Sequence, residues 1–221
     1  MTFAEHVLLF QKNLRLDIDL PKGVEVMNPY LEEEVAQLCE KFYKKFYNDN
    51  DQRVLVLGIN PGRFGGGITG IPFTDPVKLE KLGLGNDLPK KRELSADFIY
   101  QMIDACGGAQ KFYKKFYIGA VSPLGFIKDE KNLNYYDVKG LPEILESFIV
   151  KCLKEQLSWG MNKEICYCLG EGENYKHIQR LNARYGFFNE IAPLPHPRFI
   201  MQYRRKRVGE FISSYKVKLK I

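Results

Sequence analysis

The segment LGINPGRFGGGITGIPF, residues 57–73, continues an apolar run that starts at residue 53, and it carries six glycines between Gly58 and Gly70. A glycine-rich turn directly after a buried strand indicates that the backbone approaches another group closely, because glycine has no Cβ and tolerates positive φ. That group can be a nucleotide, a base or another strand. The segment therefore predicts a buried strand followed by a loop that contacts a ligand or a neighbouring element.

Four short apolar runs have the composition of strands, and helical patterns with one apolar stripe lie between them. We expect strands at residues 53–59, 116–121, 164–169 and 187–192. We expect helices at residues 30–46, 95–106, 141–157, 175–185 and 202–215. Strands that alternate with helices predict an α/β fold, with a mostly parallel sheet covered on both faces. In such sheets the ligand binds at the carboxyl ends of the strands.

The chain has 221 residues and no segment typical of a linker, which predicts a single domain, residues 1–221, with an N-terminal helical extension of about residues 1–50 packed on it. Its five cysteines form no CxxC pair and lack the spacing of zinc or iron–sulfur ligands, so we expect no metal. The N-terminus lacks the features of a signal peptide, and no apolar run has the length of a membrane helix. We therefore expect a cytoplasmic, non-secreted monomer.

The charge balance is basic, with 33 Lys and Arg against 27 Asp and Glu, and part of the excess is local. The run Arg204, Arg205, Lys206, Arg207 is followed by three more lysines near the C-terminus. Such a cluster attracts polyanions, most often nucleic acid. A solvated helix face is the alternative interpretation.

Each predicted strand ends in a loop with glycine or proline, and these loops meet at one edge of a parallel sheet. The first loop lacks the Lys-Ser/Thr ending of a phosphate-binding NTPase, but it offers the amide of Asn60 and the ring of Phe73. A turn residue and a core residue are the simpler interpretations of this pair. Of three histidines only His196 follows a strand, between two prolines that restrict the loop. Together with Asn60 it forms a candidate site. The loop at residues 170–174, GEGEN, can present amides to a phosphate, although its glutamates argue against an anion.

Residues 58–73, GINPGRFGGGITGIPF, resemble the first motif of the uracil-DNA glycosylase superfamily, specifically its single-strand-selective monofunctional branch. The match runs through N-P-G, F-G, T-G and P-F without a gap, and His196 with Pro197 resembles the second motif. The resemblance covers roughly residues 54–207. It implies a three-layer α/β/α sandwich with a central four-stranded, mostly parallel sheet, and an enzyme that flips a damaged base out of DNA into a pocket.

The resemblance also implies roles for individual residues. Asn60 would position the hydrolytic water, Phe73 would stack on the base, and His196 would donate a hydrogen bond to a base carbonyl. The base-binding pocket would consist of Gly62, Phe64, Gly66, Phe73, Ala120 and Ser122. Such groups suit a reaction in which the departing base gains negative charge, and the reaction needs no cofactor. No lysine lies in the matched motifs to form a Schiff base, so we expect a monofunctional glycosylase without strand cleavage.

The chain departs from the family at Ala120, where relatives carry an asparagine that reads the base edge. Either the hydroxyl of Ser122 replaces that amide, or the pocket is more permissive and accepts hypoxanthine or xanthine as well as uracil. Gly66, where relatives have a bulkier residue, favours the roomier pocket. Ser122 is equally well explained as a turn residue. Asp75 can assist the water, but a helix N-cap is the better interpretation of its position.

The segment after His196 has the residues expected of a wedge that enters DNA, with a basic run behind it for phosphates. A helix start with buried apolar residues is the alternative. The proposed DNA contacts are Arg198, Phe199, Ile200, Arg204, Arg205 and Arg207. DNA is thus the expected partner, and it would hold the protein at the nucleoid. A catalytically inactive DNA-binding protein on the same fold is the second hypothesis, motivated by Ala120, and a nucleotide-binding α/β enzyme is the third.

Overall fold

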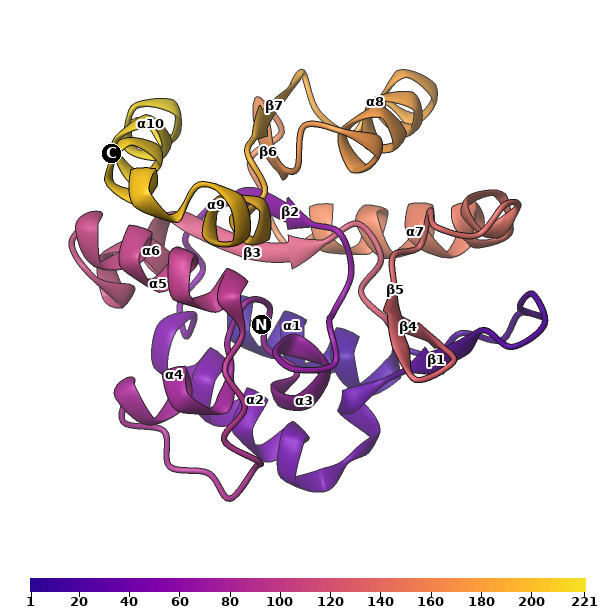
Figure 1. Ribbon diagram of the computed structural model, residues 1–221, viewed down its shortest axis with the longest axis horizontal. Helices are drawn as coiled ribbons and strands as arrows, with labels where there is room; N and C mark the ends of the chain where they lie inside the picture. Colours follow the sequence, from indigo (N-terminus) through magenta and orange to yellow (C-terminus); the bar gives the residue numbers. More distant parts are fainter.

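The computed structural model describes residues 1–221, and its centre is a parallel sheet of four strands in the order β3-β2-β6-β7 (Figure 1). These strands are β2 (Val54–Gly58), β3 (Phe116–Ala120), β6 (Ile165–Leu169) and β7 (Glu190–Leu194). All three pairings are parallel, so the loops that follow the strands share one edge. Helices flank the sheet, and the predicted α/β fold class is confirmed.

The N-terminal helices pack beside the edge strand β3, in the lower half of Figure 1. Helix α1 (Phe3–Asn13) begins with a capping box between Thr2 and Glu5, and α2 (Glu33–Phe46) follows a 3₁₀ turn at Pro29–Leu31. The expected helix at residues 30–46 therefore starts three residues late, because its first turn is 3₁₀. The ring of Phe3 lies 5.3 Å from that of Tyr117 on β3.

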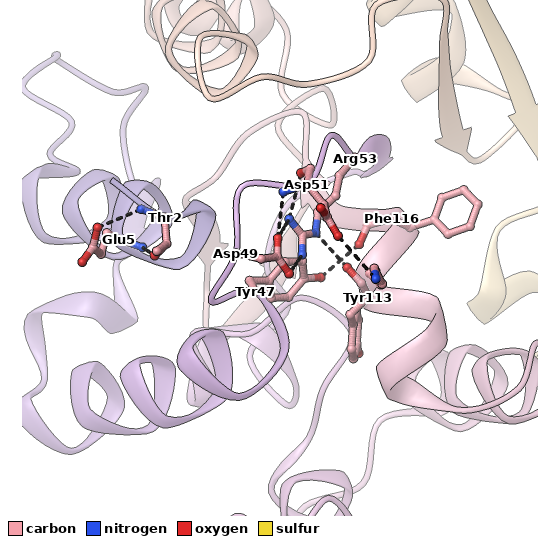
Figure 2. A network of polar contacts seen from close by, with 9 residues as sticks. Thr2, Glu5, Tyr47, Asp49, Asp51, Arg53, Tyr113 and Phe116 are labelled. Carbon is pink, nitrogen blue, oxygen red and sulfur yellow. Dashed lines mark hydrogen bonds and ion pairs between the residues drawn. The ribbon is translucent and has the colours of Figure 1, made fainter.

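Arg53, directly before β2, joins the N-terminal helices to the sheet (Figure 2). Its fully buried guanidinium donates a hydrogen bond of 2.8 Å to the carbonyl of Tyr113 and forms an ion pair of 2.8 Å with Asp49. The same group lies 4.6 Å from the ring centre of Phe3 and 4.8 Å from that of Tyr47. One hydrophobic cluster includes both the first helix and the sheet, which supports our proposal of a single domain.

Three further expected helices are present. The helix expected at residues 141–157 has those bounds, and those expected at 95–106 and 175–185 differ by one or two residues. No helix combines the length and the apolar character that crossing a membrane requires. The helices between β2 and β7 are α3 (Gly66–Thr69), α4 (Pro76–Lys81), α5 (Leu94–Ala105), α6 (Ala109–Lys115), α7 (Leu141–Leu157) and α8 (Glu173–Tyr185). No residue range was predicted for the short helices α3, α4 and α6.

The fourth strand was expected at residues 187–192 and lies at Glu190–Leu194 instead. Phe187 and Phe188 are core residues of the preceding loop, where the amide of Asn182 exchanges two hydrogen bonds with the Phe188 backbone. Because these loop residues are apolar, they have the composition expected of a strand. Strand β7 includes Pro193, which an edge strand tolerates because one side of its backbone needs no partner.

The single helix expected at residues 202–215 is wrong. The structure has α9 (Pro197–Tyr203), a 3₁₀ turn at Arg205–Arg207 and α10 (Val208–Leu219). His196 caps α9, because its ring Nδ1 accepts a hydrogen bond of 3.1 Å from the backbone amide of Arg198. The segment expected as a wedge therefore begins a helix, in which Ile200 is buried and Phe199 is exposed.

A second, antiparallel sheet was not predicted. Its order is β1-β4-β5, with β1 (Glu25–Met27), β4 (Gly125–Lys128) and β5 (Lys131–Leu133), and Figure 1 shows it to the right of the helices α1 and α3. Strands β4 and β5 form a hairpin whose turn residues, Asp129 and Glu130, both have positive φ. Such turns favour Asn-Gly, so this pair gave no hairpin signal. The hairpin places β5 beside the carboxyl edge of the parallel sheet.

Candidate active site

The carboxyl edge of the parallel sheet opens into a cavity of about 520 Å³. The loops after β2, β6 and β7 form its walls, together with β5 and the segment before α5. The cavity brings together Asn60, Gly62, Phe73 and His196 from the predicted site, with Arg198 and Phe199 from the predicted DNA contacts. These residues are separated by up to 139 positions along the chain (60 to 199), so only the parallel topology unites them.

The side-chain amide of Asn60 is held in one orientation. Its Nδ2 donates to the carbonyls of Leu133 at 3.1 Å and Pro61 at 3.3 Å, and its Oδ1 accepts from the backbone amide of Tyr135 at 3.0 Å. In the opposite orientation, the side-chain oxygen of Asn60 would face the carbonyl oxygens of Leu133 and Pro61. Both Nδ2 protons have acceptors, whereas Oδ1 keeps one lone pair. Asn60 can therefore accept one more hydrogen bond, for example from a water.

Tyr135 and Asn174 form a second layer of hydrogen bonds beneath Asn60, and no sequence pattern predicted this pair. The phenol of Tyr135 donates to Oδ1 of Asn174 at 2.8 Å, and both side chains are buried. Nδ2 of Asn174 in turn lies 3.3 Å from the carbonyl of Leu169 and 3.4 Å from that of Gly58. The loop at residues 170–174 thus uses its asparagine side chain to connect the strand ends.

The ring of Phe73 lies on the end of β2. A Cβ on Gly58 would approach that ring to 2.8 Å, so the glycine is required for the contact. Phe73 has a φ of +53°, a conformation that is uncommon for a bulky residue. Its ring centre is 6.1 Å from that of His196. A flat base in the cavity can therefore have an aromatic face and an imidazole as neighbours.

The imidazole of His196 is neutral at physiological pH. Burial, with a smaller contribution from the nearby charge of Arg198, lowers its pKa from 6.5 to about 4. Since Nδ1 accepts from the Arg198 amide, the proton of the neutral ring is on Nε2. The ring thus presents an N–H donor.

Four members of the predicted base pocket lie outside the cavity. Ser122 is buried and its hydroxyl donates to the carbonyl of Leu124 at 2.9 Å, as a turn residue would. Ala120 pairs with Gly58 in the sheet and has no surface on the cavity. A Cβ on Gly66 would meet the carbonyl of Ile71 at 3.3 Å, so this glycine faces its own loop and does not enlarge the pocket.

Phe64, the fourth, lies in an adjoining groove of about 380 Å³. Its ring is flanked by the guanidinium of Arg63 at 4.7 Å and the ammonium of Lys91 at 5.1 Å. The groove shares five residues with the cavity: Gly62, Glu93, Ser95, Asn132 and Arg198. The basic side chains that line it are Arg63, Arg92, Lys131 and Arg198.

The predicted DNA contacts divide into exposed and buried residues. Phe199 is 43% exposed at the rim of the cavity, and Tyr203, which was not predicted, is 61% exposed beside it. The guanidinium of Arg204 covers the Phe199 ring at 5.4 Å. Ile200 is fully buried and cannot enter DNA, which corrects its assignment. Arg205 is exposed, and Arg207 forms an ion pair of 2.7 Å with Glu210.

Glu93 is an acidic residue of the cavity that the sequence did not indicate. Burial and, to a smaller extent, the negative charge of Asp75 raise its pKa to about 7 against the opposing charge of Arg198. Asp75 itself is the N-cap of α4, with one oxygen accepting from the Lys78 amide at 2.8 Å and the other from the Glu93 amide at 2.9 Å. The N-cap interpretation of Asp75 is confirmed. No group of three or more His, Cys, Asp or Glu side chains is placed to hold a metal ion.

Comparison with known proteins identifies the family of this chain. Residues 44–220 match the family model of the Uracil DNA glycosylase superfamily. The crystal structure of wild-type SMUG2 from Pedobacter heparinus is similar, with a TM-score of 0.97 and 46% sequence identity over 100% of this chain and 97% of that chain. No match was found among curated protein sequences.

These matches show the class of protein: a DNA glycosylase, which is a hydrolase of base-excision repair. The chain belongs to the Uracil DNA glycosylase superfamily, as the family model covers most of its length. The predicted resemblance to this superfamily is thereby confirmed.

Proposed function

We propose that the protein is a monofunctional glycosylase that hydrolyses the N-glycosidic bond of a deaminated base flipped out of DNA. The substrates are uracil and the deaminated purines hypoxanthine and xanthine. The observation that carries this proposal is the pairing, in one cavity, of an Asn60 amide with a free lone pair and a neutral His196 with a free N–H.

Asn60 positions the water. Its Oδ1, already fixed by the Tyr135 amide, accepts a hydrogen bond from a water that attacks C1′ of the sugar. The bond between C1′ and the base nitrogen breaks first and its electron pair leaves with the base; the water oxygen then forms a bond to C1′ and releases a proton to the solvent. An amide is a weak base, but it suffices when the bond is largely broken before the water attacks. No lysine lies in the cavity to form a covalent intermediate, which supports the monofunctional reaction.

His196 stabilises the departing base. Its Nε2–H donates to a carbonyl oxygen on which negative charge develops, and Phe73 stacks on the ring of the base. A preorganised donor of this kind lowers the barrier by about 3–4 kcal/mol in enzymes where one has been removed. A neutral donor suits the task because burial has already removed the charged form of His196.

The surface around the cavity supports DNA as the partner. Basic side chains of the adjoining groove can bind phosphates, and the exposed rings of Phe199 and Tyr203 can stack on neighbouring bases. Arg198 belongs to both the cavity and the groove. We assign the strand that holds the flipped nucleotide to this groove, with Arg204 and Arg205 as outer phosphate contacts.

The test is base release from oligonucleotides with one uracil, hypoxanthine or xanthine, in single and double strands. Alkali reveals abasic sites, and omission of alkali tests for strand cleavage. Asn60→Ala and His196→Ala should each lower release by about 10²–10³-fold without unfolding. Asn189→Ala, an exposed asparagine at the other end of the sheet, is the matched control. Full activity in either site variant would remove that residue from the mechanism.

Ala120 favours one second candidate, a DNA-binding protein that has lost catalysis. The hydroxyl of Ser122 donates to the carbonyl of Leu124, so it is not free to replace the missing asparagine. This candidate requires salt-sensitive DNA binding and no free base from any of the substrates.

A further inference from the structure

Two polar groups converge at Gly62 on the wall of the cavity. A Cβ at this glycine would lie 3.5 Å from Nδ2 of Asn132 and 3.7 Å from Oε1 of Glu93. Both side chains line the cavity, and they come from separate segments, β5 and the residue before α5. An amide donor and a carboxyl group therefore share one small region, which the absent side chain of Gly62 leaves open.

The side-chain carboxyl group of Glu93 has no hydrogen-bond partner within the protein. It occupies the N-cap position of α5 but makes no capping hydrogen bond, and its Oε2 is buried without any hydrogen bond. The carboxyl group lies against the loop after β2 so closely that a Cβ on Gly65 would be 1.9 Å from Oε2. A buried carboxyl oxygen without a partner costs stability, so its persistence requires an explanation.

Asn132 is oriented for binding. Its Oδ1 accepts a hydrogen bond of 3.0 Å from the backbone amide of Arg63, which directs Nδ2 toward Gly62. As at Asn60, a backbone N–H donates to the side-chain oxygen and so fixes the orientation of the amide. Nδ2 is left as a donor at the wall.

We infer that Glu93 and Asn132 together read the polar edge of the flipped base, in place of the asparagine that is absent at Ala120. This inference rests on the proposed function. Uracil, hypoxanthine and xanthine share a ring N–H next to a carbonyl oxygen. Nδ2 of Asn132 donates to the carbonyl, and the carboxyl group of Glu93 accepts from the N–H. Cytosine and adenine carry a donor and an acceptor in the opposite order, so the fixed pair disfavours them.

The protonation of Glu93 adds a pH dependence. The charged groups around it are Asp75 at the start of α4, Arg198 on α9, and Arg63, Arg92 and Lys131 in the groove. With a pKa raised to about 7 by burial and Asp75, the carboxyl group is neutral in part of the molecules at neutral pH. The neutral acid offers the same donor and acceptor pair as an amide. The ionised form repels the negative charge on the departing base, so release should fall as the pH rises through about 7.

The test compares Glu93→Gln, Glu93→Ala and Asn132→Ala, with Glu190→Gln as a matched change at the opposite end of the sheet. Glu93→Gln should keep release of uracil within a few-fold at acidic pH and should abolish the decline above about pH 7. Glu93→Ala and Asn132→Ala should lower release by about tenfold or more, the effect of one lost hydrogen bond to the substrate. A wild-type pH profile in Glu93→Gln, or wild-type release in both alanine variants, would overturn the inference.

A binding measurement separates this inference from the proposed function. The probe is a single-stranded oligonucleotide with a 2′-fluorinated deoxyuridine, which resists hydrolysis, compared with the same strand containing cytosine. If Glu93→Ala and Asn132→Ala lose the preference for the uracil probe, the pair reads the base even in a protein that releases none. If both keep that preference, the inference fails whether or not the wild type is a glycosylase. Thermal unfolding of each variant confirms that the fold is retained.

Discussion

The side-chain oxygen of Asn60 accepts a hydrogen bond of 3.0 Å from the backbone amide of Tyr135, a residue 75 positions further along the chain. This contact connects the glycine-rich loop after β2 with the segment after β5. Tyr135 is itself anchored through its phenol to Asn174 at the start of α8. The orientation of the Asn60 amide thus depends on three segments that meet only in the folded protein.

Replacing Tyr135 with phenylalanine should weaken both the fold and the reaction. The change keeps the ring but leaves the buried Oδ1 of Asn174 without its donor, which costs about 1–3 kcal/mol of unfolding free energy. The backbone that holds Asn60 then has more freedom, so single-turnover base release should fall several-fold. Urea unfolding and release assays measure the two effects. Tyr185→Phe also removes a hydrogen bond, to Glu146, but lies away from Asn60; an equal loss of release in that variant would contradict the positional argument.

His196 should make the fold less stable in acid. Burial lowers its pKa in the folded protein from 6.5 to about 4, so the unfolded chain binds the proton first as the pH falls. The contribution of this group to stability is complete above about pH 6.5 and decreases as the pH falls toward about 4. His196→Asn keeps a capping side chain for α9 and removes the titration.

Urea unfolding of wild type and His196→Asn at several pH values between these limits measures the difference. The wild type should lose more stability than the variant over this range, and the His196 ring signals in NMR should remain those of the neutral form at about pH 5.5. Parallel stability curves for the two proteins would show that His196 titrates normally. His177, whose pKa burial also lowers, is present in both proteins and cancels in the comparison.

Most of the fold could be predicted from the sequence where local apolar patterns extend over many residues. Helix α7 has the predicted bounds because 17 residues carry one apolar stripe, whereas β1 and β5 are only three residues long and give no periodic signal. The strand β7 was misplaced because apolar residues of the preceding loop resemble strand residues. Local pattern thus succeeds for long elements and fails for short ones.

The site was predictable only where its residues belong to a motif. Asn60 and Phe73 lie in the glycine-rich loop, and His196 stands out between two prolines. Glu93 and Asn132 lie in segments without a pattern, and their unused hydrogen-bonding groups are properties of the folded chain. A contact across the sheet edge leaves no trace in the spacing of residues.

Arg53→Met should destabilise the protein by about 2–4 kcal/mol. The methionine fills part of the space between Phe3 and Tyr47 but leaves the buried carbonyl of Tyr113 without its donor, and Asp49 loses its ion pair. Thermal or urea unfolding measures the loss, while base release under stabilising conditions should stay close to wild type, because Arg53 precedes β2 at the end of the sheet remote from the cavity. Lys44→Met removes an exposed ion pair with Glu40 and should cost far less. Equal costs for the two variants would contradict a structural role for Arg53.

Arg198 should contribute more to DNA binding than Arg207. Arg198 borders both the cavity and the basic groove and has no ion pair, whereas the guanidinium of Arg207 is already paired with Glu210 at 2.7 Å. A phosphate contact through Arg198 releases a counterion, so Arg198→Gln should reduce the slope of log affinity against log salt by about 0.7 on single-stranded DNA. Arg207→Gln should change the slope little, because its charge is largely compensated in the free protein. Fluorescence anisotropy with a labelled strand over a range of salt concentrations measures both slopes. If the slope falls only in Arg207→Gln, the strand follows the 3₁₀ turn at Arg205–Arg207 rather than the groove, and the proposed path of the DNA must be moved to that surface.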